Sequence, residues 1–174
     1  MATAPLRTAL LAVSAVALAV APAGGLARAD EVARGGTWTS KITQQEALPL
    51  GSADRLLVAQ VAVGTNKGKA GDAYLDGAKA YFSEIVQLDR GNGPQTGTIA
   101  HVSDKGTVTS HYAGTITTTM MDGQPRTTGE GTWRLVSGTG AYGGASGSGT
   151  YTFTMVSQTD VAGEWKGGVS LPSQ

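Results

Sequence analysis

The hydrophobic pattern is clearest between Arg126 and Val156, where two segments alternate apolar and polar residues. In Thr127–Leu135, the odd-numbered positions end in tryptophan and leucine, while the even-numbered positions hold threonine, glutamate and arginine. In Gly149–Met155, the odd-numbered positions carry tyrosine, phenylalanine and methionine, and every even-numbered position is threonine. A period of two predicts β-strands with one apolar and one polar face. Eight of the 26 glycines lie between Gly129 and Gly149, which predicts a flexible turn joining the two strands.

Similar segments separated by turn residues follow one another along the rest of the chain, and no helix is predicted after residue 29. The segment Arg55–Val63 is apolar on both faces, which predicts burial on both sides or cover by another element. Gln44–Asp54 is predicted as a loop, and Gly64–Gly77 as a flexible polar connection that forms a lid or rim. The remaining predicted strands are Gly36–Ile42, Ala78–Asp89, Gln95–Ser103, Thr107–Met120 and Ala162–Leu171.

About eight strands with regular turns indicate an all-β domain, either an antiparallel sandwich or a closed barrel. Closure is favoured because it removes the exposed edges that long threonine-rich strands would otherwise present. Glycine within strands also fits the bends of a small barrel. We therefore expect an antiparallel eight-stranded closed β-barrel.

Residues 1–29 have the features of a secretory signal peptide. Arg7 supplies a positive charge, Leu10–Val20 is apolar but short for a membrane span, and Ala27-Arg28-Ala29 fits a cleavage site. An uncleaved anchor helix is the alternative. The sequence thus predicts one exported domain, residues 30–174, located outside the cell or in the periplasm without a membrane anchor.

Composition excludes several functions. The chain has no cysteine, so disulfides, thiol catalysis and cysteine metal sites are absent. Thirteen basic side chains balance thirteen acidic ones, and two of the arginines belong to residues 1–29. No basic run or stripe occurs, so we expect neither nucleic-acid binding nor attraction to an anionic membrane.

The segment from Gly131 to Thr150 carries a family resemblance. It reads Gly-Thr-Trp at residues 131–133, VSGTGAYGG at 136–144 and GSGT at 147–150. This pattern resembles the turn between two late strands of the allene oxide cyclase-like barrels, which include the dirigent proteins, although Ser137 replaces the first glycine of that turn. The resemblance implies an eight-stranded barrel with a central cavity, which often forms a homotrimer. Members differ in activity, so the resemblance does not select one.

Gly138–Gly143 also matches the bare pattern G-x-G-x-x-G. A dinucleotide site needs that turn to open a helix whose N-terminus receives the pyrophosphate. Here the turn leads into a small-residue segment and then a strand, so no nucleotide cofactor is expected.

The two histidines lie on adjacent predicted strands. A two-residue turn between these strands would place His101 and His111 on opposite faces, whereas a three-residue turn would place them on one face. Either way no third metal ligand is evident, and parity groups His111 with solvent-facing threonines. We therefore interpret both as exposed or locally bonded, and expect neither a metal site nor the triad of a serine hydrolase.

Glu84 is the most informative single residue, because its parity places it with Phe82 on an apolar face. Tyr112 shares a face with Ile116 on a later strand. If both faces line the barrel, the two polar groups meet in its interior, where desolvation raises the pKa of an unbonded carboxyl group. The alternatives are a purely structural hydrogen bond, or a bulge that turns Glu84 to solvent.

These observations favour an exported barrel that binds a small, largely apolar molecule without covalent chemistry or a cofactor. A cyclase- or isomerase-like enzyme, in which Glu84 guides a reactive substrate, is the second hypothesis. A structural envelope protein with a filled barrel is the third. Glu84 and Tyr112 would anchor the ligand, and the predicted aromatic wall consists of Trp38, Phe82, Trp133, Tyr151 and Trp165.

Overall fold

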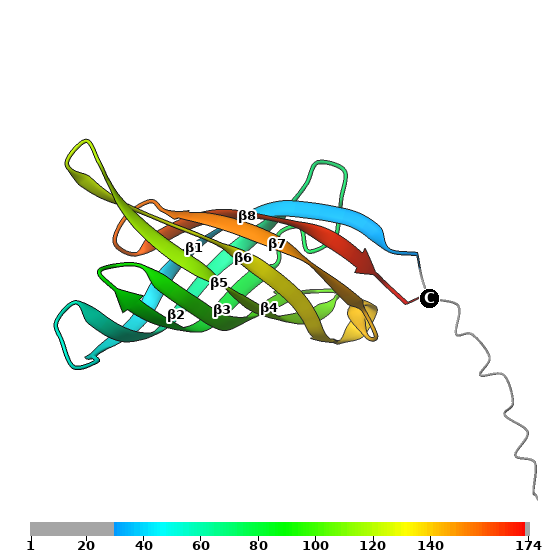
Figure 1. The fold of residues 1–174 in the computed structure, drawn as a ribbon. Coiled ribbons are helices and arrows are strands. Elements are labelled where there is room, and N and C mark those ends of the chain that lie inside the picture. The colour runs from blue at the N-terminus through cyan, green and yellow to red at the C-terminus, as the bar shows by residue number, and fades with distance from the viewer. Residues whose placement is uncertain (1–29, 173–174) are drawn as a thin grey trace, which may run out of the picture.

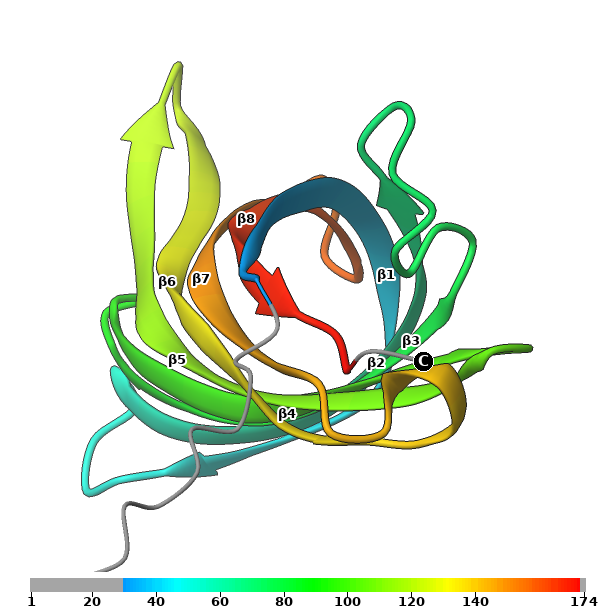
Figure 2. The ribbon, with the colours of Figure 1, turned by 90° about the vertical axis from the view of Figure 1, so that its right-hand side faces the viewer.

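The computed structural model describes residues 30–172, which form a closed barrel of eight antiparallel strands (Figure 1). Each strand pairs with the next in sequence, and β8 closes the ring on β1, as the end-on view shows (Figure 2). The predicted all-β, eight-stranded antiparallel barrel is therefore confirmed. The predicted signal peptide lies outside the described residues. Within residues 30–172, no helix is long and apolar enough to span a membrane.

The strands are joined in simple up-and-down order, and a single turn of 3-10 helix interrupts the connection between β6 and β7. The elements are β1 (Val32–Pro49), β2 (Arg55–Gly68), β3 (Lys79–Asp89), β4 (Gly93–Ser103), β5 (Gly106–Met121), β6 (Gln124–Gly138), η1 (Gly140–Tyr142), β7 (Ser146–Met155) and β8 (Asp160–Ser170).

Strand β1 is much longer than predicted. The prediction ended at Ile42 because a β-bulge interrupts the alternation there. Ile42 pairs with Ala62 and Gln44 pairs with Val61, so Thr43 is the extra residue. A bulge shifts the side chains that follow it to the other parity. The segment after residue 43 therefore lacks a continuous alternation, and the prediction of a loop over Gln44–Asp54 was wrong for its first six residues.

The outer face of β2 and β3 carries exposed apolar side chains among polar ones, so the predicted cover for β2 was wrong within residues 30–172. Val61 on β2 retains 37% of its accessible surface, and Tyr81 and Ile85 on β3 retain 43% and 45%. Val102 on β4 is also exposed. We refer to these four side chains as the outer apolar surface.

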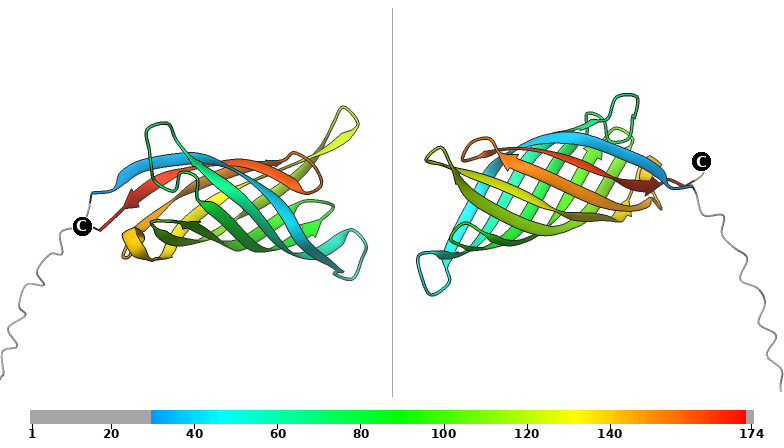
Figure 3. Two further views of the ribbon diagram at one scale, coloured as in Figure 1. Left: turned by 180° about the vertical axis from the view of Figure 1, so that it is seen from behind. Right: turned by 45° about the horizontal axis from the view of Figure 1, so that its top comes forward.

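The β2–β3 connection lies at the same end of the barrel as η1 (Figure 3). Tyr74 and Leu75 in this connection are buried and pack in one cluster with Tyr142 of η1. The side-chain amide of Asn66 donates a 2.8 Å hydrogen bond to the carbonyl of Leu75. The connection predicted as a polar lid or rim is therefore anchored by an apolar cluster.

Glycines inside the strands make room for aromatic rings on the inner face. A Cβ atom on Gly163 would lie 2.5 Å from the Trp38 indole, and one on Gly167 would lie 2.5 Å from the Trp133 indole. Such distances are shorter than real packing permits, so these rings lie directly against the backbone of β8. This arrangement lets a small barrel hold large aromatic side chains and still leave internal space.

Candidate ligand-binding cavity

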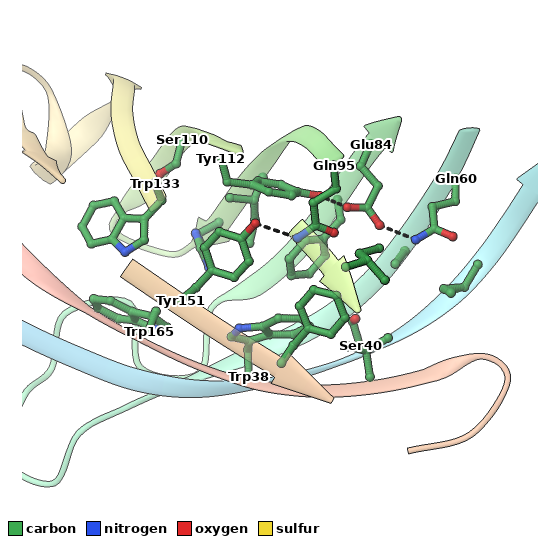
Figure 4. A pocket seen from close by; sticks show the side chains of 18 of the residues that line it. Trp38, Ser40, Gln60, Glu84, Gln95, Ser110, Tyr112, Trp133, Tyr151 and Trp165 are labelled. Carbon is green, nitrogen blue, oxygen red and sulfur yellow. Dashed lines mark hydrogen bonds between the residues drawn. The ribbon is translucent and has the colours of Figure 1, made fainter. Parts of the chain in front are cut away.

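A cavity of about 120 Å³ lies inside the barrel (Figure 4). For scale, an apolar cavity of about 150 Å³ binds benzene in another protein. The interior is therefore hollow, unlike the filled barrel of the structural hypothesis. All seven side chains that the sequence indicated line this cavity, namely Glu84, Tyr112, Trp38, Phe82, Trp133, Tyr151 and Trp165.

Three pairs of aromatic rings form much of the wall. The ring centroids of Trp38 and Phe82 are 5.0 Å apart at a tilt of 39°. Tyr112 and Tyr151 pack edge to face at 5.7 Å, and Trp133 and Trp165 do so at 5.8 Å. These distances and angles are those of stabilising aromatic contacts, so the wall is pre-formed.

Glu84 holds a fixed orientation because both of its oxygens accept hydrogen bonds. The Tyr112 hydroxyl donates to Oε2 over 2.8 Å, and the Gln60 amide donates to Oε1. Gln60 is directly opposite Glu84 in the β2–β3 ladder. Tyr112 reaches Glu84 from β5 by crossing Gly97 on β4, which is the ladder partner of both residues.

Burial raises the pKa of the Glu84 carboxyl group above its usual value, and the hydrogen bonds from Gln60 and Tyr112 partly oppose this shift. The pKa of the Tyr112 hydroxyl is also raised, first by burial and then by the charge of Glu84. Tyr112 is thus a neutral donor throughout the physiological pH range. None of the lining residues is a lysine or an arginine.

Gln95 and Tyr151 form a second polar group beside the first. The Gln95 amide donates a 2.6 Å hydrogen bond to the Tyr151 hydroxyl, whereas Gln95 Oε1 is buried without a protein partner in the described chain. Burial raises the pKa of Tyr151 to about 12, although the hydrogen bond from Gln95 opposes the shift. Sequence reasoning missed Gln95, although its parity with Ile99 indicates the inner face.

The two histidines lie on opposite faces of the barrel wall. Ser103 pairs with Gly106, so the turn between the two strands has two residues. His101 points inward and is buried. His111 is exposed, and its Nδ1 atom lies 3.2 Å from the hydroxyl oxygen of Thr98. The interpretation of His101 as exposed or locally bonded was therefore wrong. Burial lowers its pKa to about 4, so its imidazole is neutral at neutral pH. Its Nδ1 atom has no hydrogen-bond partner in the described part of the protein.

The cavity contains few groups suited to metal binding. Among residues 30–172, histidine, aspartate and glutamate side chains nowhere gather in groups of three or more that could hold a metal ion. Glu84 and His101 are the cavity-lining residues of these types. The polar groups of the cavity are thus suited to hydrogen bonding and proton exchange.

The comparisons with known proteins bear on the fold. The sequence matches no family model and no curated protein. The structure resembles that of a DUF3224-family protein of unknown function from Shewanella oneidensis MR-1, with a TM-score of 0.55 and 16% identity over 83% of this chain and 100% of that one. The expected barrel fold is confirmed. A pterocarpan synthase dirigent protein aligns with a TM-score of 0.49 and 16% identity, over 92% of this chain and 100% of its own.

Proposed function

We propose that this protein is exported and binds a small, largely apolar molecule inside its barrel without covalent chemistry. The observation that carries the proposal is the cavity of about 120 Å³, walled by aromatic pairs and containing a few oriented polar groups. Ligand sites in proteins commonly combine an apolar wall with a small number of polar anchors. Glu84 and Tyr112 are the proposed anchors.

Binding is favoured over catalysis by the way the polar groups are engaged. Both oxygens of Glu84 accept hydrogen bonds from protein groups, and one of these donors is the Tyr112 hydroxyl. A cyclase- or isomerase-like activity remains the second proposal, since the raised pKa of Glu84 is suited to proton exchange. Turnover of an epoxide or of a radical-coupling substrate that is abolished in Glu84→Gln would support catalysis.

Intrinsic fluorescence offers a direct test of binding, because all three tryptophans of the chain line the cavity. Titration with single-ring apolar molecules should shift the tryptophan emission and saturate. Ile99→Phe, which fills the cavity, should weaken the response. Val136→Phe adds an aromatic ring on the exposed face of β6, away from the cavity and from the outer apolar surface, and should leave the response unchanged. A panel that produces no shift, and no contact in ligand-observed NMR, would contradict the proposal.

We also propose self-association through the outer apolar surface, with the trimer implied by the family resemblance as the expected state. Exposed apolar patches commonly mark interaction sites. Sedimentation should give a mass above that of the monomer for the native chain. Ile85→Asp should shift the mass to the monomer, whereas the outward-facing Thr98→Asp, on the neighbouring strand, should shift it less.

A further inference from the structure

We propose that the ligand of the cavity is a compact organic cation, namely an ammonium group carried on an apolar body of about one ring. The inference rests on the proposed binding function and adds the charge and the size of the ligand. It follows from three features of the cavity: an acid without a counter-charge, neutral donors that orient this acid, and an aromatic wall.

The charged side chains that line the cavity are of one sign. Glu84 is the acidic residue among the lining residues, and lysine and arginine are absent from them. The ion pairs within residues 30–172 join Arg34 to Asp72 and Arg90 to Asp89, so neither involves Glu84. A buried carboxylate without a cation is energetically unfavourable, and a ligand that brings positive charge would relieve this cost.

The neighbours of Glu84 hold it as an acceptor without neutralising it. From β2 the neutral amide of Gln60 donates to one oxygen, and from β5 the neutral hydroxyl of Tyr112 donates to the other. On β4 the facing residue is Gly97, which has no side chain. A carboxylate has about four acceptor positions, so positions remain for the N–H groups of an ammonium ion.

The remaining titratable groups of the cavity add no positive charge. His101 on β4 is neutral at neutral pH, because burial lowers its pKa to about 4. Tyr74 in the β2–β3 connection and Tyr151 on β7 have raised pKa values and stay protonated and uncharged. The cavity therefore has a net negative character at neutral pH once Glu84 ionises, which disfavours anionic ligands such as carboxylates.

The aromatic wall supplies the second means of binding a cation. The faces of tryptophan and tyrosine attract ammonium groups, and the attraction is stronger when the contact is desolvated. Trp38, Trp133, Trp165 and Tyr151 all line the same cavity as Glu84 (Figure 4). Aromatic rings around one carboxylate are a combination that recognises ammonium ligands by charge and by shape.

The experiment compares two probes of nearly equal shape, benzylamine and benzyl alcohol. At pH 7.5, calorimetry or tryptophan fluorescence should show benzylamine binding at least about tenfold more tightly, which corresponds to about 1.4 kcal/mol. Glu84→Gln should remove this preference. The matched control is Glu164→Gln on the exposed face of β8, and it should retain the preference.

A pH titration of the native protein gives an independent measurement that needs no variant at Glu84. The preference for benzylamine should decrease as the pH falls and Glu84 takes up a proton, while binding of benzyl alcohol changes little. Equal affinity for both probes, or a preference that persists in Glu84→Gln or at all pH values, would overturn the cation inference and leave the proposed function intact. Failure of both probes and of neutral apolar molecules to bind would overturn the proposed function itself.

Discussion

The Tyr112 hydroxyl donates a 2.8 Å hydrogen bond to Glu84, although the two residues lie on strands that do not pair with each other. The bond exists because Gly97 lies between them: a Cβ atom there would be 2.5 Å from the Tyr112 hydroxyl oxygen and 2.7 Å from the carbonyl oxygen of Ser83. A glycine on β4 thus allows two side chains to meet across a strand.

Gly97→Ala should therefore displace Tyr112 and break its bond to Glu84. We expect a loss of about 1–3 kcal/mol in the free energy of unfolding, from overpacking and from an unpaired buried acceptor. Urea denaturation followed by circular dichroism measures this loss. Gly143→Ala is the control, since the nearest atom to its new Cβ lies 3.4 Å away, and it should change stability little.

Glu84 should make the protein less stable as the pH rises. Because its pKa is raised in the folded state, the fold favours the protonated form. Its contribution is greatest below the unfolded pKa of 4.5 and is lost as the pH rises through the folded value. Glu84→Gln should remove this decline, which urea midpoints measured at several pH values would reveal. Parallel curves for the native and variant proteins would contradict the prediction.

His101 should have the opposite effect. The pKa of His101 falls from 6.5 to about 4 on folding. Its contribution to the free energy of unfolding is therefore fully present above pH 6.5 and is lost as the pH decreases toward 4. The full loss is about 3 kcal/mol. His101→Gln should flatten this acid limb, whereas His111→Gln on the outer face should retain it. Following the imidazole protons by NMR over the same pH range would test the assignment directly.

The Arg34–Asp72 contact should hold the β2–β3 connection in place at its end of the barrel. Asp72 also accepts a 2.9 Å hydrogen bond from the backbone N–H of Tyr74, and the Arg34 guanidinium lies 4.9 Å from the Tyr74 ring centroid. Asp72→Asn should increase amide hydrogen exchange in residues 69–78 and cost about 1–3 kcal/mol locally.

The matched control for this contact is Asp89→Asn, which removes the exposed partner of Arg90. That pair is 3.9 Å apart, and its side chains retain 82% and 64% of their accessible surface. Exposed pairs contribute about 0–1 kcal/mol, so exchange in the β2–β3 connection should be unaffected. Equal exchange in Asp72→Asn and the native protein would show that the apolar cluster alone holds the connection.

The strands around the glycine-rich turn were predictable because their aromatic side chains all fall on one parity. In β6 and β7, Trp133 and Tyr151 face inward and the threonines between them face outward, as parity indicates. Parity alone could not locate the end of β1, because the bulge at Thr43 reverses it. It also could not show Gln60 beside Glu84, which depends on the register between two strands.

The candidate site was predicted in part for a similar reason. Apolar neighbours mark Glu84 as an inward-facing acid. Gln95 and His101 share the parity of Ile99, but Ile99 is the one large apolar side chain on the inner face of β4, so the pattern there is weaker. Tyr74 and Leu75 lie in a connection without periodicity. Their burial arises from tertiary contacts, above all from Asn66, which joins Leu75 to the Trp165 indole on β8.

The pairing of β1 with β8 has a consequence for folding. Val32 pairs with Val169 and Lys41 with Asp160, so the ring closes through contacts between residues that are far apart in the sequence. Such topologies have high contact order, because the chain loses much entropy before these contacts form, and they fold in milliseconds to seconds. Until β8 docks, the sheet has two free edges and its aromatic face is exposed to water. The same step therefore completes the fold, removes the aggregation-prone edges and encloses the internal cavity.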